Sequence, residues 1–227
     1  MKIAIFGCSW SHGTSQLDNH RNWPYYFAAN NPNYEIYNYA MSASSIQFQI
    51  YLYEYVKKHK PADRYIFQCT RPERFTYFKN GMKFENLLED IPSKNGGLNN
   101  YKWIPPYNAN KEIRRITSAS IKPVSEGILK GWTLEDIQFS KLYYKLANLE
   151  IMELEWKMCI EYIKNKVDFC FLHTEGEFRN IKNLYCIEDI LGREYCKQNF
   201  YESHDQHHFN KKGLQWQANW VKENAKL

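Results

Sequence analysis

The sequence of 227 residues lacks several features that mark common classes of protein. No apolar run is long enough to cross a bilayer, and the short apolar stretch at residues 3–6 is interrupted by Gly7, too early for a signal-peptide core. None of the six cysteines forms a C-x-x-C pair, so the sequence predicts free, buried thiols rather than a disulfide framework or a zinc site. Internal repeats and low-complexity segments are also missing. We therefore expect a cytoplasmic protein with no membrane contact, no metal and no cofactor.

The charged residues are also not predominantly of one sign. The 30 basic and 25 acidic residues give a net charge of +5, and the basic residues are scattered along the chain. No basic stripe with interleaved aromatic residues is present, so we do not expect a nucleic-acid partner. The hydrophobic content of 44% and charged content of 24% are typical of a globular chain, and the length suits one domain over residues 1–227 with room for an insertion.

The first fourteen residues organise the rest of the chain. Residues 3–6 form a continuous apolar run, which is typical of a parallel strand buried on both faces. Gly7-Cys8-Ser9-Trp10-Ser11-His12-Gly13 follows directly. In an open α/β sheet the reacting groups lie just beyond the carboxyl ends of the strands, so Ser9 is a candidate nucleophile. The competing interpretation is an ordinary strand-to-helix turn, in which glycine and serine are common.

A candidate base lies near the other end of the chain. A serine hydroxyl needs a base to take its proton, and histidine titrates in the right range. His208 is preceded three residues earlier by Asp205, so one tight turn would place the carboxylate beside the imidazole and orient it. Asn210 then reads as the N-cap of a final helix over residues 211–226.

Together these stretches resemble the SGNH (GDSL-like) hydrolase family. Gly7-Cys8-Ser9-Trp10-Ser11 is similar to its first block, and Asp205-Gln206-His207-His208 to its last block, D-x-x-H. Residues 38–45 are similar to its second block, with Ala43 at the position of the usual glycine. The asparagine of its third block is missing from residues 68–74, so the chain resembles a divergent member.

The resemblance implies roles for the residues at these positions. Ser9, His208 and Asp205 would form the catalytic triad, and the backbone N–H groups of Ser9 and Ala43 would bind the oxyanion. Thr70 or Arg71 would replace the missing asparagine. The competing interpretation of the last segment is an ion pair between Arg71 or Arg74 and Glu73 on a solvated loop.

The alternation of strand and helix patterns predicts a parallel α/β sheet. The resemblance implies more: a flavodoxin-like three-layer α/β/α sandwich. We expect about five strands, at residues 3–6, 34–39, 63–69, 167–173 and 184–187.

The implied function is a serine ester hydrolase of the carboxylesterase or acetylesterase kind, acting on a small-molecule or carbohydrate ester. The alternatives are a non-catalytic binding module on the same scaffold and an acyltransferase at the same site. A third alternative makes the Cys8 thiolate the nucleophile, against simple packing of Cys8 behind the loop.

The middle and late segments carry weaker patterns. Residues 77–131 lack periodicity, and we expect a lid-like insertion offering Tyr101, Trp103 and Tyr107 to a substrate, or an interaction surface for another subunit. The oligomeric state stays open. His173 and Glu175 follow the fourth strand and would either touch a substrate or be structural. Over residues 133–165 we expect a helix or helix pair whose large apolar residues pack in the core: Leu142, Leu146, Leu149, Leu154, Met158 and Ile160.

Overall fold

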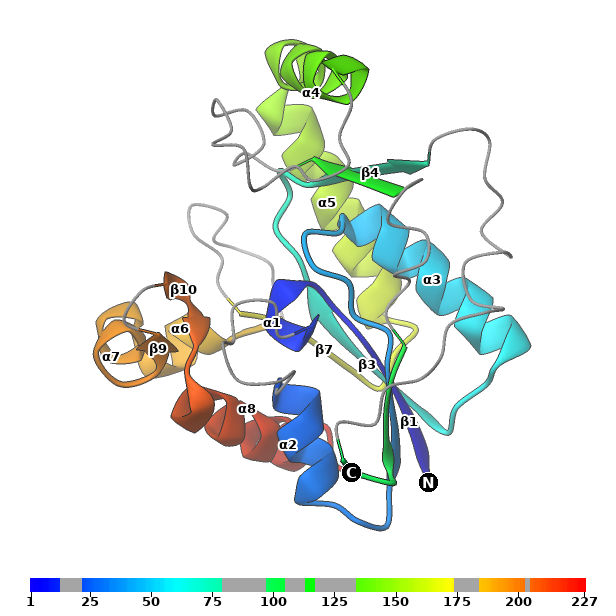
Figure 1. Ribbon diagram of the computed structural model, residues 1–227, viewed down its shortest axis with the longest axis vertical. Coiled ribbons are helices and arrows are strands. Elements are labelled where there is room, and N and C mark those ends of the chain that lie inside the picture. The colour runs from blue at the N-terminus through cyan, green and yellow to red at the C-terminus, as the bar shows by residue number, and fades with distance from the viewer. Residues whose placement is uncertain (13–21, 79–96, 105–112, 117–133, 174–183, 203–204) are drawn as a thin grey trace.

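The protein has an α/β fold built on a six-strand, all-parallel sheet (Figure 1). The computed structural model describes residues 1–12, 22–78, 97–104, 113–116, 134–173, 184–202 and 205–227. The strand order is β5-β2-β1-β3-β7-β8. The strands are β1 (Lys2–Phe6), β2 (Glu35–Asn38), β3 (Arg64–Cys69), β5 (Tyr101–Trp103), β7 (Phe169–Leu172) and β8 (Tyr185–Cys186). The predicted parallel α/β sheet is confirmed.

Helices flank both faces of the sheet. One face is packed against α3 (Ile46–His59) and α5 (Leu149–Lys164), and the other against α2 (Trp23–Ala29) and α8 (Lys211–Asn224). Strand β1 runs between these layers, so its alternate side chains belong to different cores and residues 3–6 are all buried. The continuous apolar run in the sequence is explained by this burial on both faces.

Three helices begin at residues that cap them, and the predicted N-cap at Asn210 is confirmed. The side-chain oxygens of Asn22, Ser45 and Asn210 each accept a hydrogen bond from the backbone N–H three residues further on, at 2.8, 3.3 and 3.0 Å. Such a bond satisfies one of the donors that have no partner within the helix. These caps fix where α2, α3 and α8 begin, and therefore how the loops before them leave the sheet.

The segment 77–131 contributes a sixth strand that we did not predict. Strand β5 pairs in parallel with β2, and its Tyr101 and Trp103 side chains are buried in the core. Both side chains were expected to be available to a substrate, and the structure corrects this expectation. A strand of three residues is too short to show a period of two, which explains why the pattern was missed. Tyr107 lies outside the described residues.

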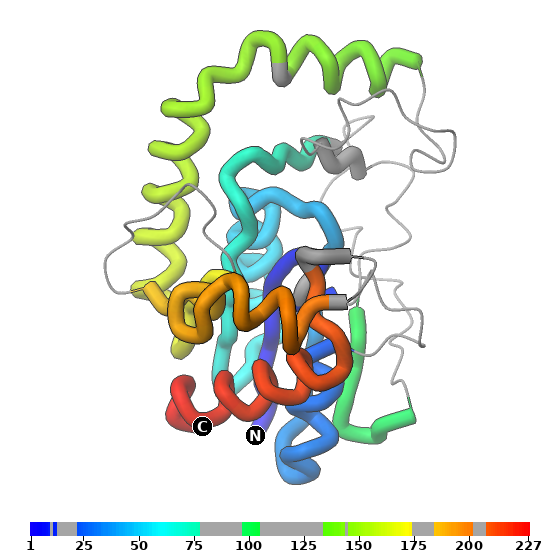
Figure 2. The backbone as a smooth tube through the Cα atoms, turned by 90° about the vertical axis from the view of Figure 1, so that its left-hand side faces the viewer, coloured from blue at the N-terminus to red at the C-terminus, as the bar shows by residue number. Residues whose placement is uncertain are grey.

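Two further strands and one further helix lie beyond the sheet. Strand β4 (Phe75–Phe78) pairs antiparallel with β6 (Ile113–Ile116). Helix α4 (Leu134–Leu146) precedes α5, and Figure 2 shows this pair along the outer edge of the molecule.

The prediction of core packing over residues 133–165 is wrong for most of its residues. Ile160 is buried, but the exposed fractions of the other five range from 52% to 72%. These five are Leu142, Leu146, Leu149, Leu154 and Met158. For Leu149, Leu154 and Met158 the physical reason is that only one face of α5 is turned toward the sheet, whereas Leu142 and Leu146 belong to α4, which lies beyond the sheet.

The chain ends in four short elements before α8. These are α6 (Ile187–Leu191), α7 (Arg193–Asn199), β9 (Tyr201–Glu202) and β10 (Asp205–Phe209). The six cysteines are free, as predicted, and four of them are buried: Cys8, Cys69, Cys186 and Cys196. Among the helices that the structure describes, none combines the length and the apolar character that a membrane span needs.

Candidate functional site

Ser9 lies directly beyond the carboxyl end of the central strand β1. Helix α1 (Ser9–His12) begins at this residue, and the Ser9 side chain is nearly buried, with 6% of the residue exposed. The chain goes from β1 to β2 on one side of the strand and later reaches β3 on its other side. In an open α/β sheet, ligands bind at such a change of direction. The position predicted for the nucleophile therefore lies at the carboxyl edge of the sheet, where the strand order changes direction.

The loop before Ser9 is held by a buried glutamine of α3. The Gly7 N–H donates to Gln49 Oε1 at 2.7 Å, and Gln49 Nε2 donates back to the Gly7 carbonyl and to Ser44 Oγ. One side-chain amide thus pairs with both backbone polar groups of Gly7, whose carbonyl also accepts from the Met41 N–H at 3.0 Å. We did not single out Gln49 from the sequence, although a polar residue on the apolar side of a helix is a visible signal.

Glycine is required at position 7 because the side chains of Ser11 and Gln68 approach its Cα closely. A Cβ at Gly7 would lie 2.9 Å from Ser11 Cβ and 3.2 Å from Gln68 Cβ. Ser11 Oγ donates to Gln68 Oε1, and Trp23 Nε1 lies 3.0 Å from both oxygens. Ser11 is fully buried in this network, so its hydroxyl supports the loop rather than facing a ligand. We did not single out Gln68 from the sequence, although it interrupts the apolar run of β3, which is a visible signal.

A second network holds the far end of α1. Asn38 Nδ2 donates to the Ser11 carbonyl at 2.8 Å and to Tyr101 OH at 3.1 Å, and Tyr101 OH donates to Asn22 Oδ1 at 3.0 Å. Asn22 Nδ2 donates in turn to the His12 carbonyl at 3.2 Å. Burial raises the pKa of Tyr101, so the phenol stays a donor. Tyr101 therefore has a structural role, because its hydrogen bonds to Asn38 and Asn22 help to hold α1 in place.

Ala43 follows β2 at the same edge of the sheet and has a left-handed backbone, with φ of 59°. This region favours glycine because an L side chain crowds the following carbonyl there. The turn around it is tight: the Ser44 N–H and hydroxyl both donate to the Met41 carbonyl, at 3.3 and 2.7 Å. Within the described part of the chain, no hydrogen bond uses the N–H groups of Ala43 or Ser9, or the Ser9 hydroxyl.

The segment after β3 does not present a side-chain donor in the way we expected. Thr70 is fully buried, and its Oγ1 accepts from Arg74 Nη1 at 2.7 Å. Arg71 Nε lies 3.0 Å from Glu73 Oε1. The Arg71 pairing is the one that the competing interpretation expected. It uses the guanidinium that would otherwise replace the missing asparagine.

His208 lies in an irregular hairpin rather than in a tight turn. Asp205 pairs with Glu202 and Phe209 pairs with Tyr201. Between these two pairs β10 advances by four residues and β9 by only one. The extra residues bulge out of the pair, as at a β-bulge. His208 is half-buried in this bulge, and the Asp205 side chain lies outside the described residues.

The hairpin is packed against the end of strand β7. The His173 ring is fully buried, and its centroid lies 4.3 Å from that of Phe209 in an edge-to-face contact. The His173 carbonyl accepts from the Glu188 N–H at 3.1 Å. His173 is therefore structural, which was one of its two interpretations, and it links β10 to the carboxyl edge of the sheet. Glu175 lies outside the described residues.

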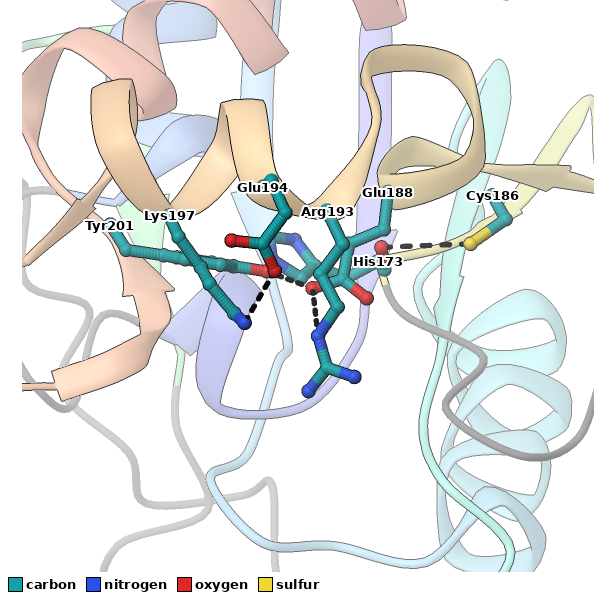
Figure 3. Close-up of polar contacts among 7 residues, drawn as sticks. All are labelled: His173, Cys186, Glu188, Arg193, Glu194, Lys197 and Tyr201. Atoms are coloured by element: carbon teal, nitrogen blue, oxygen red, sulfur yellow. Dashed lines mark hydrogen bonds and ion pairs between the residues drawn. The ribbon is translucent and has the colours of Figure 1, made fainter.

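A buried acid and phenol fix the other strand of this hairpin (Figure 3). Tyr201 OH donates to the carboxylate of Glu188, and Arg193 Nε lies 3.9 Å from the same carboxylate oxygen. Burial and this carboxylate raise the pKa of Tyr201, so the phenol keeps its proton. Since Glu188 belongs to α6, the hairpin that carries His208 is tied to the helix after β8.

The edge of the sheet thus collects most of the predicted residues. Ser9, Ala43 and Thr70 follow three adjacent strands, and His208 is carried to the end of β7 by the hairpin. Among the described residues, no hydrogen bond joins Ser9 to His208. Cys8 is fully buried, as the packing interpretation of this residue expected. No cluster of three or more metal-binding side chains occurs within the described residues.

No protein-family model matches the chain, and no curated protein matches it. The case for a function therefore rests on the site itself.

Proposed function

We propose that the protein is a serine ester hydrolase of the SGNH type. The observation that carries the proposal is the position of Ser9, which opens α1 at the carboxyl end of the central strand with its hydroxyl not engaged by any described residue. The order β2-β1-β3-β7-β8 is the order 2-1-3-4-5 of a flavodoxin-like sheet, with β5 added at one edge. With helices on both faces, this is a three-layer α/β/α sandwich.

The backbone of Ala43 supports the same proposal. The SGNH resemblance places a glycine at this position, and the φ of 59° is the conformation that favours glycine. An alanine that keeps this backbone also keeps the direction of its N–H. The N–H groups of Ser9 and Ala43 then form the oxyanion hole.

The proposed chemistry follows from these positions. The Ser9 hydroxyl attacks the carbonyl carbon of the ester and gives its proton to His208, which Asp205 orients. His208 then returns the proton to the leaving alcohol, and a water molecule releases the acid by the reverse sequence. A general base supplies about 10²–10⁴-fold, and one oxyanion donor about 10²–10³-fold. The missing asparagine therefore predicts slow turnover of a small-molecule or carbohydrate ester.

The test compares matched variants on a series of short p-nitrophenyl esters. We expect Ser9→Ala and His208→Ala each to lower kcat by at least the hundredfold of a lost general base. His59→Ala is the control, because His59 lies at the far end of α3, where it stacks on Tyr55. Equal activity of the wild type and both site variants would refute the proposal.

A second candidate, a non-catalytic binding module, is favoured by the segment after β3. Arg71 is paired with Glu73, and Thr70 Oγ1 accepts from Arg74, so the missing asparagine has no evident side-chain substitute. A fluorophosphonate probe separates the two candidates. Stoichiometric labelling that Ser9→Ala abolishes supports the hydrolase, whereas a folded chain that is not labelled supports the binding module.

A further inference from the structure

Helix α5 is apolar on two opposite faces. The face turned to the sheet is buried, with exposed fractions between 0% and 8%: Met152, Trp156, Ile160 and Ile163. The opposite face carries four large apolar side chains whose exposed fractions range from 42% to 64%: Ile151, Leu154, Met158 and Tyr162. Their spacings of three, four and four residues place them in one stripe. We call this stripe the outer stripe of α5.

The outer stripe is unusual for a surface helix. Such a helix normally turns one apolar face to the core and a polar face to water. A contiguous exposed apolar surface marks an interaction site more often than a scatter of single residues does. Figure 2 shows α5 at the outer edge of the molecule, away from α2 and α8. The stripe is therefore accessible to a partner.

The charges beside the stripe indicate which partner fits. Residues 149–156 contain Glu150, Glu153 and Glu155 and no basic residue, which gives −3. Residues 157–164 contain two lysines, Lys157 and Lys164, and one glutamate, which gives +1. If two copies of α5 packed in parallel, the half with a net charge of −3 would face the same half of the second copy. If they packed antiparallel, each half with a net charge of −3 would face a half with a net charge of +1.

The stripe is also symmetric under the antiparallel arrangement. The midpoint of Leu154 and Met158 is position 156, and that of Ile151 and Tyr162 is about 156.5. A two-fold axis through the middle of α5 therefore maps the stripe onto itself, as an isologous interface requires. We propose that the chain forms a homodimer in which α5 packs antiparallel against α5 of a second copy.

The area is consistent with a small, specific dimer. Aromatic side chains bury about 150–250 Å² each and the large aliphatic ones somewhat less, so four half-exposed side chains offer on the order of 400 Å² of apolar surface. At the roughly 60% apolar share of protein interfaces this corresponds to about 700 Å² per copy. Specific interfaces start at about 600 Å² per partner. We therefore expect a reversible dimer with a dissociation constant in the micromolar range.

Sedimentation velocity of the full chain, from well below to well above micromolar concentration, tests the dimer. We expect the wild type to shift from monomer to dimer. The double variant Leu154→Glu with Met158→Glu is expected to stay monomeric with an unchanged far-UV spectrum. Ile190→Glu is the matched control, because Ile190 is 48% exposed on α6 and its variant is expected to dimerise normally. A monomeric wild type, or a double variant that still dimerises, would overturn the proposal.

Disulfide trapping tests the direction of packing. In a Cys159→Ser background, a Leu154→Cys chain is mixed with a Met158→Cys chain under mild oxidation. Antiparallel packing predicts mixed disulfides, because position 154 faces position 158 of the second copy. Cross-links that form only between identical chains would indicate parallel packing and contradict the proposed arrangement. Neither experiment depends on whether the protein hydrolyses esters.

Discussion

Replacing Ala43 by glycine should stabilise the protein, which is the opposite of the usual effect of this substitution. Ala43 has φ of 59°, in the left-handed region. A side chain in this conformation costs about 1–2 kcal/mol. Glycine removes that cost but makes the unfolded chain more flexible, which costs about 0.4–1 kcal/mol. The net expected gain is about 0.5–1 kcal/mol.

The matched control is Ala62→Gly. Ala62 is also half-buried in a loop, but its φ is not positive, so the same substitution should destabilise by about 0.5–1 kcal/mol. The two variants therefore differ in sign. For a chain of this size the gain corresponds to a rise in Tm of about 1–4 °C.

Urea unfolding of the wild type and both variants, followed by tryptophan fluorescence, measures the difference. The esterase assay adds a functional reading, because Ala43→Gly keeps the backbone N–H and is expected to keep the activity. If Ala43→Gly destabilises as much as Ala62→Gly does, the positive φ of Ala43 and its glycine-like role are refuted.

Three further outcomes follow from buried polar groups. Gln49→Met should destabilise by about 1–3 kcal/mol, because the buried Gly7 N–H loses its acceptor, while the Gly7 carbonyl keeps the Met41 N–H as a donor. Gln47→Met, on the exposed side of α3, should be neutral by urea unfolding. Tyr201→Phe should lower the free energy of unfolding by about 1–3 kcal/mol, because the buried Glu188 carboxylate loses a hydrogen-bond donor. The control is Tyr195→Phe at an exposed position, and equal stability of the two variants would contradict this expectation. Burial raises the pKa of Cys196 to about 11, so the folded chain holds a proton that the unfolded chain loses above about pH 9. Stability should fall with rising pH between these values by at most about 1.4 kcal/mol per unit, and Cys196→Ala should flatten that slope in urea titrations under reducing conditions.

Much of the fold was predictable because its signals are local. The apolar run at residues 3–6 reports burial on both faces of a strand, and the caps Asn22, Ser45 and Asn210 report where helices begin. Each signal depends on a few neighbouring residues, and each is confirmed. Ser9 was proposed for the same reason, since a glycine-containing loop directly after a buried strand is a local pattern.

The rest could not be predicted because it depends on contacts between distant segments. Strand β5 is too short to show a period, and it exists because β2 offers it a free edge. The sequence of the outer stripe of α5 resembles that of a helix face packed in the core. The spacing of leucine and methionine is the same whether a helix face is turned to the core or to solvent. The bulge before Phe209 depends on pairing with Tyr201, which spacing alone does not reveal.

The two candidate functions make the same demand on the loop before Ser9 but different demands on the hairpin that carries His208. Burying Gln49 is unfavourable unless its amide is satisfied, and both ends of this amide are hydrogen-bonded, so the loop that it holds is kept in one conformation. A rigid loop suits both candidates, because a preorganised donor improves binding as well as catalysis. Only the hydrolase also needs the His208 hairpin to meet that loop. Variants of Tyr201 loosen the hairpin without touching Ser9, so a binding module should tolerate them and a hydrolase should lose kcat.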